Sequence, residues 1–316
     1  MKKALISGVT GQDGCLLAAL LLEKGYQVVG TSRNWEAANS RGMKNPAPEQ
    51  RITTATLDTT SVEEWQALLD TEQPDEIYHL AAATSVGASF ARPWETLVQG
   101  AQNAVAPLEA LRLSGAKSRL FLACSTECFG DSAGQPITEA TPLSPRSPYG
   151  IAKAQAWLSL KVYRESYGLW ACAGIFSNHE SALRGADFVT GKIAAAVHKI
   201  ARGDQQEIRM GNLDVERDWG WAEEYVEAAW RMLQADHSQD YVVATGSSIR
   251  LREFAEAAFA AGGLNLKEHL IVDAGLYRPG EIQRVACDPA RIEKELGWKA
   301  QTSGLDVARR LVADSS

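Results

Sequence analysis

A tyrosine and a lysine four residues apart are the most informative pair for chemistry in this chain. Tyr149 and Lys153 stand in the segment Ser-Pro-Tyr-Gly-Ile-Ala-Lys, and Pro148 is compatible with the start of a helix. Residues at this spacing share one face of a helix, so the lysine ammonium would lie beside the phenol. A phenol has a pKa of about 10, and a neighbouring cation lowers it. The pair therefore predicts a tyrosine base that acts on a substrate hydroxyl.

The strand-like run at residues 119–124 is followed by a serine, a threonine and a glutamate. Open α/β sheets bind ligands at the carboxyl ends of their strands, so the Ser125 hydroxyl can hydrogen-bond a substrate oxygen beside Tyr149. Simple alcohol oxidation does not need Glu127, whereas removal of a proton next to a new carbonyl needs a second base. A solvated loop carboxylate is the alternative interpretation of Glu127. We predict that the catalytic residues are Ser125, Glu127, Tyr149 and Lys153.

A glycine-rich segment between the first predicted strand and the first predicted helix indicates a dinucleotide site. Gly8, Gly11 and Gly14 lie in the sequence Gly-Val-Thr-Gly-Gln-Asp-Gly. Glycine lets the backbone approach a pyrophosphate, and a helix N-terminus offers N–H groups and a partial positive charge. A plain glycine-rich turn is the alternative, but the placement between strand and helix favours the dinucleotide site.

The end of the second predicted strand indicates which dinucleotide binds. An NAD site usually has an acidic residue there, which binds the ribose 2′-hydroxyl, whereas this chain has Thr-Ser-Arg-Asn at residues 31–34. Arg33 can pair with a 2′-phosphate through charge-assisted hydrogen bonds, and a solvated surface arginine is the alternative. We predict NADP as the cofactor. Two further strand ends are expected to meet it, with Asp58 and Thr59 at the adenine and with Leu80 and Ala82 beneath the cofactor.

These segments need a scaffold that brings strand ends to one edge. Strand-like and helix-like patterns alternate through the first half of the chain, and repeated β-α units build a parallel sheet wound on both faces. We predict an α/β fold, a Rossmann-type doubly wound parallel sheet with a smaller mixed α/β substrate-binding lobe. The expected strands are 3–8, 27–31, 51–57, 76–81, 119–124 and 241–244, and the expected helices are 12–24, 94–113, 222–234 and 252–261.

The order of elements becomes mixed after Asn178, so the second lobe is expected to begin there. The predicted NADP-binding domain comprises residues 1–177 with about 213–246, and the predicted substrate lobe comprises about 178–212 with 247–316.

Two local features are predicted outside the regular pattern. Ser61 and Glu64 have the spacing of a capping box, with Ser61 as the N-cap and Glu64 reaching back to it. Residues 34–50 lack periodicity and contain glycine and proline, so a surface excursion is expected there.

Composition and charge exclude several classes of protein. The chain has 316 residues, of which 45% are hydrophobic and 22% are charged, as is typical of a folded globular protein. Its formal net charge of −7 argues against a nucleic-acid partner, because phosphate backbones need a basic surface. The N-terminus shows no signal-peptide pattern, and no segment approaches the roughly 20 apolar residues that span a bilayer. The five cysteines form no metal-binding pair. We predict a cytoplasmic protein with reduced thiols, no bound metal and no membrane partner.

Several longer motifs are more specific than the glycine loop. Besides residues 8–14, 125–130 and 146–153, they are Asn-His-Glu-Ser at 178–181, Phe-Val-Thr at 188–190, Gly-Asn-Leu-Asp at 211–214, Arg-Asp-Trp-Gly at 217–220 and Tyr-Arg-Pro-Gly-Glu at 277–281. On these residues, and over nearly its whole length apart from 32–52, the chain resembles the GDP-mannose 4,6-dehydratases. These are extended short-chain dehydrogenases/reductases of the NAD-dependent epimerase/dehydratase superfamily.

The resemblance implies a closed redox cycle on a GDP-sugar, with GDP-mannose as the expected substrate. Hydride would leave C4 for the nicotinamide of NADP while Tyr149, backed by Lys153, takes the hydroxyl proton. Glu127 would remove the C5 proton, water would leave C6, and the hydride would return to C6 to give GDP-4-keto-6-deoxymannose. NADP would be regenerated in each turnover and stay bound. The resemblance further implies a hydro-lyase that forms a homodimer or a homotetramer.

The resemblance also implies binding roles for residues at matching positions. Ser125 takes the place of the family's catalytic threonine, and Thr126 takes that of the neighbouring serine. The cofactor-binding residues would be Gly8, Thr10, Gly11, Gln12, Asp13, Gly14, Arg33, Asp58, Thr59, Leu80, Ala82, Tyr149, Lys153, His179 and Arg184. The substrate-binding residues would be Thr84, Thr126, Asn178, Val189, Lys192, Arg217, Arg278 and Glu281. The cations among them suit a diphosphate in a chain of net negative charge.

The chain departs from the family's pattern at three places. Ser125 and Thr126 reverse the usual order, Gly191 stands where an arginine is usual, and the paired arginines after the second strand are reduced to Arg33.

Other functions are considered beside GDP-mannose dehydration. A dehydratase of another GDP-hexose or GDP-heptose would use the same residues. A nucleotide-sugar 4-epimerase or 4-ketoreductase on the same scaffold would not need Glu127. A catalytically silent NADP-binding protein would need none of the catalytic residues.

Overall fold

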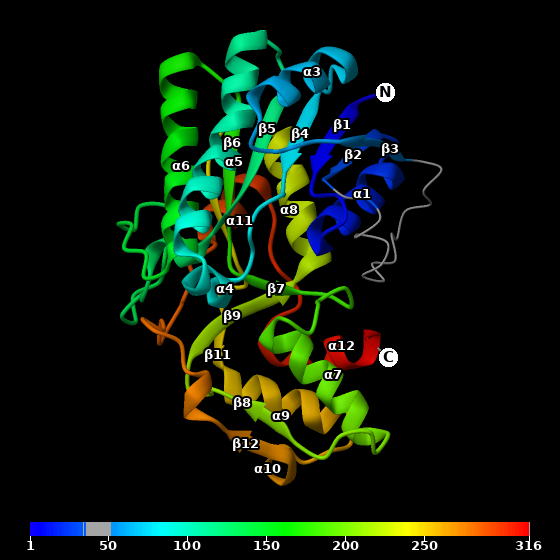
Figure 1. Ribbon diagram of the computed structural model, residues 1–316, viewed down its shortest axis with the longest axis vertical. Helices are drawn as coiled ribbons and strands as arrows, with labels where there is room; N and C mark the ends of the chain where they lie inside the picture. The colour runs from blue at the N-terminus through cyan, green and yellow to red at the C-terminus, as the bar shows by residue number, and fades with distance from the viewer. Residues whose placement is uncertain (34, 36–51, 316) are drawn as a thin grey trace. The chain divides into compact units, whose positions relative to one another are not determined.

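The computed structural model describes residues 1–33, 35 and 52–315, and the chain divides into two compact units (Figure 1). Unit 1 comprises Met1–Cys128, Ser147–Ile175 and Val226–Tyr241, and unit 2 comprises Phe129–Arg146, Phe176–Tyr225 and Val242–Ser316. This division differs from the predicted one mainly at 129–146 and 213–225, which belong to unit 2. Apart from residue 35, the surface excursion predicted for 34–50 lies outside the described residues.

Unit 1 is built around a doubly wound sheet, which has seven strands within the described residues, in the order β10-β6-β5-β4-β1-β2-β3. The last residue of β6, Phe176, and residues 242–243 of β10 belong to unit 2. The strands are β1 (Lys3–Ser7), β2 (Gln27–Ser32), β3 (Ile52–Thr56), β4 (Glu76–His79), β5 (Arg119–Ser125), β6 (Ala171–Phe176) and β10 (Tyr241–Val243). β1 pairs in parallel with both β2 and β4, and the pairs β2–β3 and β4–β5 are also parallel. The strand order reverses between β1 and β4, which is where such sheets bind ligands. The predicted fold class and the six predicted strands are confirmed, apart from small differences at strand ends, whereas β6 was not predicted.

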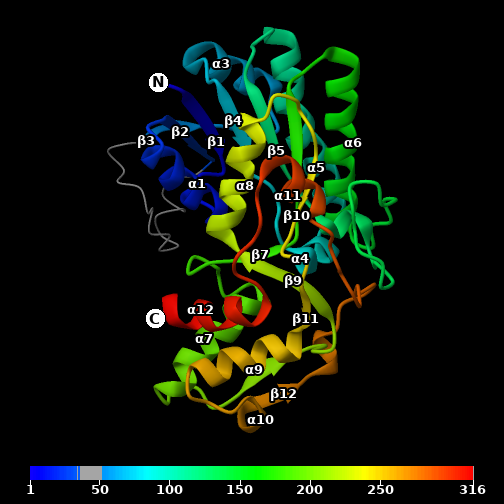
Figure 2. The ribbon, with the colours of Figure 1, turned by 180° about the vertical axis from the view of Figure 1, so that it is seen from behind.

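Helices cover both faces of this sheet. On one face α5 (Pro93–Ser114) and α6 (Pro148–Tyr167) lie side by side, with α3 (Val62–Glu72) against α5 and the short α4 (Val86–Ala91) against both (Figures 1 and 2). On the other face lie α1 (Gln12–Glu23) and α8 (Ala222–Gln234), whose residues from Val226 onward belong to unit 1. The Lys24 ammonium, just after α1, is 3.7 Å from the ring centroid of Trp230 on α8. The helices predicted at 12–24, 94–113 and 222–234 are confirmed.

The start and end of α6 follow directly from its sequence. The Ser147 side chain caps the helix by accepting the Gly150 N–H at 3.0 Å, and Pro148 occupies the first turn, where it needs no N–H partner. Gly168 ends the helix in the left-handed conformation, with a φ of 69°. One face of α6 is buried between Tyr149 and Leu160, and its side chains point into unit 1.

The capping box predicted at α3 is only half present. The Ser61 hydroxyl accepts the Glu64 N–H at 3.1 Å, as predicted for the N-cap. The Glu64 carboxylate, however, accepts the Asp58 N–H at 2.6 Å instead of reaching back to Ser61. The Ser61 N–H already donates to the Asp58 carbonyl at 3.0 Å, so it does not need the carboxylate.

Unit 2 has its own sheet and core. Within the described residues it contains a sheet in the order β11-β9-β7 and the strand pair β12-β8. Trp219, Trp221, Phe254 and Phe259 are all buried in its core, and the rings of Trp219 and Phe254 are 4.9 Å apart. The strands are β7 (Asn178–Glu180), β8 (Ile208–Met210), β9 (Glu216–Trp221), β11 (Ser248–Arg250) and β12 (Leu270–Val272), and the helices are α7 (Val189–Ala201), α9 (Leu251–Ala261), α10 (Leu266–His269), α11 (Ala290–Leu296) and α12 (Gly304–Asp314).

In the part of the chain that the structure describes, no helix combines the length and the apolarity needed to cross a membrane. All five cysteines lie in described segments, and each is a free, buried thiol.

Candidate active site

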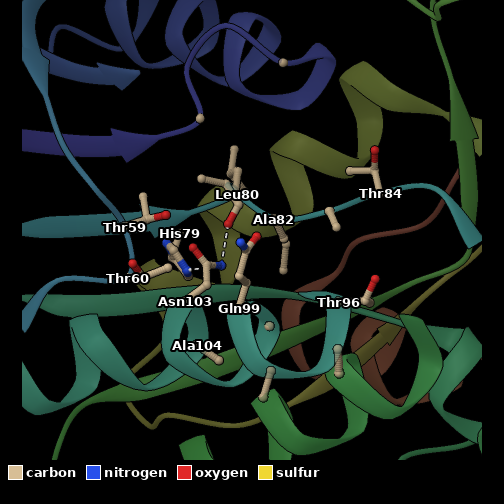
Figure 3. Close-up of a pocket in the computed structure, with 18 of the residues that line it drawn as sticks. Thr59, Thr60, His79, Leu80, Ala82, Thr84, Thr96, Gln99, Asn103 and Ala104 are labelled. Carbon is tan, nitrogen blue, oxygen red and sulfur yellow. Dashed lines mark hydrogen bonds between the residues drawn. The ribbon is translucent and has the colours of Figure 1, made fainter. Parts of the chain in front are cut away.

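A cavity of about 690 Å³ lies in unit 1, at the carboxyl edge of its sheet (Figure 3). It is lined by the loops after β1, β2, β3 and β4, by the end of β5, and by side chains of α4, α5 and α6. The structure therefore brings together residues that lie far apart in the sequence. The predicted site residues that line the cavity are Gly8, Thr10, Gly11, Arg33, Thr59, Leu80, Ala82, Thr84, Tyr149 and Lys153.

The glycine loop has the close backbone approaches that a dinucleotide site requires. Gly8 has a φ of +79°, and a Cβ added there would lie 2.9 Å from the Ala81 Cα. A Cβ at Gly14 would lie 2.2 Å from the Gly8 carbonyl oxygen, so a side chain at either position would displace backbone. This compact turn directs the N-terminus of α1 toward the cavity, and its shape fits a bound pyrophosphate. Gln12 and Asp13, also predicted here, hydrogen-bond each other at 3.0 Å in the first turn of α1 and do not line the cavity.

The residues predicted to distinguish NADP from NAD and to meet the adenine lie near the ends of β2 and β3. Arg33 is exposed and lines the cavity. Asp58 does not line it, and its carboxylate accepts the Thr60 N–H at 3.0 Å and the Thr60 hydroxyl at 2.7 Å. These hydrogen bonds, together with the charge of Arg33, lower the pKa of the Asp58 carboxyl. Within the described residues, the buried hydroxyl of Thr31, which also lines the cavity, has no hydrogen-bond partner.

The predicted catalytic side chains meet at the junction of β5 and α6. Lys153 is buried and donates from Nζ to the Ala123 carbonyl at 2.7 Å, and its Nζ lies 5.8 Å from the centroid of the Tyr149 ring. The Ser125 side chain hydrogen-bonds the Tyr149 phenol, and the charge of Glu127 acts on the same group. Glu127 lies in a short 3-10 helix, Thr126–Phe129, and its backbone N–H donates to the Ser125 hydroxyl at 3.3 Å.

The structure corrects the predicted direction of the pKa shift of Tyr149. The sequence predicts that Lys153 lowers the pKa of Tyr149, whereas in the structure burial raises it, and the carboxylate of Glu127 raises it further. The hydrogen bond from Ser125 opposes this effect but does not overcome it. Burial also lowers the pKa of Lys153, because the charged form of each group loses its solvation.

The order of the two hydroxyl residues at the end of β5 has a structural consequence. Ser125 is half-buried and reaches Tyr149, whereas Thr126 is only 4% exposed. Ser125 is therefore the hydroxyl that the fold presents beside the phenol.

The aspartate of the Arg-Asp-Trp-Gly motif has a structural role. Asp218 is fully buried in unit 2, where its carboxylate accepts the Ser177 hydroxyl, the N–H and hydroxyl of Thr245, and the Gly246 N–H at 2.8–3.1 Å. These bonds tie β9 to the segments that precede β7 and β11. Arg217, a predicted substrate-binding residue, precedes Asp218 on β9 and donates from Nη1 to the Glu216 carbonyl at 2.8 Å.

The two other cofactor residues predicted from the Asn-His-Glu-Ser region lie in unit 2. The His179 ring stacks on Tyr225 with centroids 4.7 Å apart, and its Nδ1 is 2.8 Å from the Ser177 carbonyl oxygen. Arg184 forms an ion pair with Glu180 at 2.5 Å and also donates to the His179 carbonyl. Both side chains thus support the β7 region within unit 2.

The remaining predicted substrate residues are also in unit 2. Lys192 on α7 donates from Nζ to the Arg209 carbonyl at 2.6 Å, and Glu281 accepts from the Asn212 side chain at 3.1 Å. Both contacts connect elements around β8, so these residues share one region. Asn178 begins β7, Val189 begins α7, and Arg278 is exposed.

Close packing explains why position 191 is a glycine in this chain. A Cβ there would lie 2.3 Å from the Gly185 carbonyl oxygen and 2.8 Å from that of Arg184. The first turn of α7 therefore packs directly on the preceding loop backbone. An arginine at this position would require that loop to move.

Sequence reasoning missed several cavity residues on α5 and at the end of β4. Thr96, Gln99 and Asn103 are polar residues spaced by three and four positions, so they share one face of α5, and all three line the cavity (Figure 3). His79, the last residue of β4, also lines it. The polar stripe within the helix predicted at 94–113 was the available signal.

Comparison with known proteins places the chain in a family. The model of a protein family described as GDP-mannose 4,6 dehydratase matches residues 5–311. The chain belongs to the GDP-mannose 4,6-dehydratase family. GDP-mannose 4,6 dehydratase 1 of Arabidopsis thaliana is 39% identical to it over 98% of this chain and 89% of that protein. GDP-mannose 4,6-dehydratase of Sinorhizobium fredii is 39% identical over 99% of this chain and 96% of that protein.

Solved structures confirm the fold of this family member. The dTDP-glucose 4,6-dehydratase DesIV of Streptomyces venezuelae, solved with NAD and TYD bound, has a TM-score of 0.87 at 21% identity, over 99% of this chain and 96% of that chain. The UDP-glucose 4-epimerase of Thermus thermophilus, solved with NAD, has a TM-score of 0.85 at 22% identity, over 99% of this chain and 98% of that chain. Identities this low establish the shared α/β architecture alone.

Proposed function

We propose that this protein is a GDP-mannose 4,6-dehydratase, a hydro-lyase that converts GDP-mannose to GDP-4-keto-6-deoxymannose. Membership of the family supports this function. The observation that carries it is the meeting of Glu127, Ser125 and Tyr149 at one point of unit 1. A 4-epimerase or a 4-ketoreductase needs the tyrosine and the hydroxyl but has no step for the extra carboxylate.

We infer that the cavity of unit 1 holds NADP. When bound, the nicotinamide supplies the hydride acceptor for C4 and the hydride donor for C6. The glycine loop at Gly8 and Gly11 would hold the pyrophosphate, and Arg33 would pair with the 2′-phosphate. The small side chains of Ala81 and Ala82 leave room for the cofactor beside the end of β4.

Different residues of the chain would carry out the separate proton transfers. Tyr149 accepts the C4 hydroxyl proton, and Ser125 holds the same oxygen through its hydroxyl. Lys153 supplies a positive charge beside the phenol, which favours the phenolate. Glu127 removes the C5 proton once the C4 carbonyl has made it acidic. That proton and the hydroxyl that leaves C6 make up the water released. C5 would regain one proton when C6 is reduced, and the proton that Tyr149 took from the C4 hydroxyl balances it.

The residues proposed to bind the nucleotide diphosphate lie in unit 2. Lys192, Arg217 and Arg278 are cations, and a diphosphate requires such groups in a chain with a net charge of −7. Asn178, Val189 and Glu281 are proposed to contact the rest of the nucleotide, while Thr84 and Thr126 are proposed to contact the sugar from unit 1.

The direct test is to incubate the purified protein with GDP-mannose and to follow the nucleotide sugar by mass spectrometry. We expect a product lighter by one water, formed without added cofactor if NADP is retained through purification. GDP-hexoses, a GDP-heptose, UDP-glucose and dTDP-glucose run in parallel define the sugar and the base. A product of unchanged mass with an inverted C4 would instead establish a 4-epimerase.

Replacing Arg33 with Ala is expected to weaken NADPH binding by roughly tenfold to a hundredfold, because charge-assisted hydrogen bonds to the 2′-phosphate are lost. NADH lacks this phosphate, so its dissociation constant should not change. Both constants can be measured by fluorescence titration, with Lys117→Ala, another exposed cation of unit 1, as the control. Equal weakening of both dinucleotides would contradict the proposed role of Arg33.

We propose that the protein forms a homodimer through α6. Ile151, Leu158 and Val162 are 44–54% exposed and lie seven and four residues apart, so they form one apolar stripe on this helix. The opposite face of α6 is buried in unit 1, so the stripe is left for another partner. A second copy presents the same stripe, which suits the self-complementary interface of a two-fold dimer.

Leu158→Lys is expected to shift the protein toward the monomer, weakening self-association by roughly tenfold or more, because a charge would have to be buried in an apolar contact. Sedimentation or light scattering over a range of concentrations measures this shift. Val272→Lys is the control, because Val272 is 50% exposed and lies on β12 of unit 2. An unchanged mass for Leu158→Lys would place the interface elsewhere.

We also propose that unit 1 is the NADP-binding domain, that unit 2 is the nucleotide-sugar lobe, and that the protein works in the cytoplasm. Five free, buried thiols suit a reducing compartment.

A further inference from the structure

Three polar side chains form a connected network beneath the cavity of unit 1. Ser7 ends β1, His79 ends β4, and Asn103 lies in the middle of α5. Ser7 Oγ is 2.7 Å from His79 Nδ1. Asn103 Nδ2 is 3.0 Å from His79 Nε2 (Figure 3). Asn103 Nδ2 also lies 2.6 Å from the Ala81 carbonyl oxygen, and the Ala81 N–H donates weakly to Ser7 Oγ at 3.5 Å.

The chemistry of the partners determines the donors at Asn103 and His79 in this network. The Ala81 carbonyl can only accept, so the Asn103 atom that faces it must be the amide nitrogen. The second hydrogen of that nitrogen points to His79 Nε2, which must then carry a lone pair. The proton of the neutral imidazole therefore sits on Nδ1 and is donated to the Ser7 hydroxyl oxygen.

The surroundings keep this imidazole neutral. His79 is 4% exposed, and a second proton on Nε2 would face the Asn103 amide hydrogens. Burial lowers the pKa of His79 to about 3, and the charge of Lys153 adds to the lowering. The network thus has one arrangement at neutral pH.

The network joins the two segments that would form the base of the cofactor site. Ser7 pairs with His79 in the sheet register, and the Leu80 N–H donates to the Ser7 carbonyl at 3.1 Å. Gly8 follows Ser7 directly and packs against Ala81, where an added Cβ would lie 2.9 Å from the Ala81 Cα. A shift of the Ala81 peptide would therefore move the glycine loop as well.

We propose that Asn103 is a positioning residue, which sets the height of the Ala81 peptide under the dinucleotide and holds His79 as the Nδ1-protonated tautomer. This role rests on the proposed cofactor site, but it needs neither a dehydratase reaction nor GDP-mannose. It acts through the Ala81 peptide and not through direct contact with a reacting atom.

The first test is made on the unaltered protein. Nitrogen-15 NMR of the histidine rings distinguishes a protonated Nδ1 from a protonated Nε2. We expect His79, assigned by its loss in His79→Gln, to show the Nδ1–H form across the neutral pH range. A protonated Nε2 would overturn the arrangement even if no Asn103 variant folds.

The second test measures NADPH binding by Asn103→Leu and Asn103→Asp, which keep the size of the side chain but remove its two donors. We expect the dissociation constant for NADPH to rise roughly tenfold in both, because the Ala81 carbonyl loses its partner. Gln102→Leu is the matched control, since Gln102 is the adjacent exposed residue of α5 and lies outside the cavity lining. Thermal unfolding is followed in parallel for all variants.

The outcomes separate this role from a merely structural one. Lower thermal stability with unchanged NADPH affinity in both variants would overturn the positioning role. Weakened NADPH affinity with a shifted His79 tautomer supports it. If the unaltered protein binds no NADPH, the proposed cofactor fails, and the positioning role fails with it. Binding of NADPH without turnover of any sugar would reject the proposed dehydration and leave the positioning role standing.

Discussion

Glu127→Gln is expected to abolish dehydration of GDP-mannose while C4 oxidation still proceeds. Glutamine keeps the shape of the side chain beside Ser125 but cannot accept the C5 proton. A positioned general base contributes about a hundredfold to ten-thousandfold to a rate, so turnover should fall by that factor. Oxidation at C4 uses Tyr149 and Ser125, which the variant retains. Reduced nicotinamide should therefore accumulate on mixing with substrate, because the hydride has no C6 acceptor to return to.

Two measurements check this expectation on the same sample. Absorbance of reduced nicotinamide in a stopped-flow instrument reports C4 oxidation, and mass spectrometry reports the loss of water. Glu165→Gln, which neutralises an exposed carboxylate on α6, serves as the control and should behave like the unaltered protein. Unchanged dehydration by Glu127→Gln would show that the mechanism does not use this carboxylate. It would favour the alternative interpretation, in which Glu127 is a solvated loop residue.

Tyr149→Phe is expected to stop the reaction one step earlier. Without the phenol no group accepts the C4 hydroxyl proton, so neither reduced nicotinamide nor dehydrated product should form. The expected loss is again about a hundredfold to ten-thousandfold. Tyr167→Phe is the matched control, because Tyr167 is a 53% exposed tyrosine at the end of the same helix. Accumulation of reduced nicotinamide at the normal rate in Tyr149→Phe would contradict the assignment.

The raised pKa of Tyr149 adds a pH dependence with a defined sign. Burial and the nearby carboxylate of Glu127 raise this pKa, so only a small fraction of the phenol is ionised at neutral pH. As long as the pH is below the pKa, the ionised fraction of the phenol increases about tenfold for each unit by which the pH rises. The single-turnover rate of C4 oxidation should therefore rise with pH through the neutral range. Lys153→Met should move this rise to higher pH, whereas a flat profile in the unaltered protein would argue against a tyrosine base.

The local elements of the site were determined by the sequence alone. The run Ser-Pro-Tyr-Gly-Ile-Ala-Lys contains its own helix start, and the spacing of Tyr149 and Lys153 places both on one face. The glycine loop and the alternation of strands and helices likewise depend on neighbouring residues. The strand-end rule then predicted which edge of the sheet carries the site. Each of these inferences rests on contacts within one turn, one strand or one β-α unit.

The tertiary structure decided what depends on packing between distant segments. His79 and Asn103 are 24 positions apart and meet only because α5 covers the end of β4. The pKa of Tyr149 moved opposite to the prediction, because burial depends on the whole unit and not on the nearest lysine. The Glu64 carboxylate accepts the Asp58 N–H and not the Ser61 N–H, because the Ser61 N–H donates to the Asp58 carbonyl. Desolvation and competition for hydrogen bonds are collective effects, so they become defined only when the fold is complete.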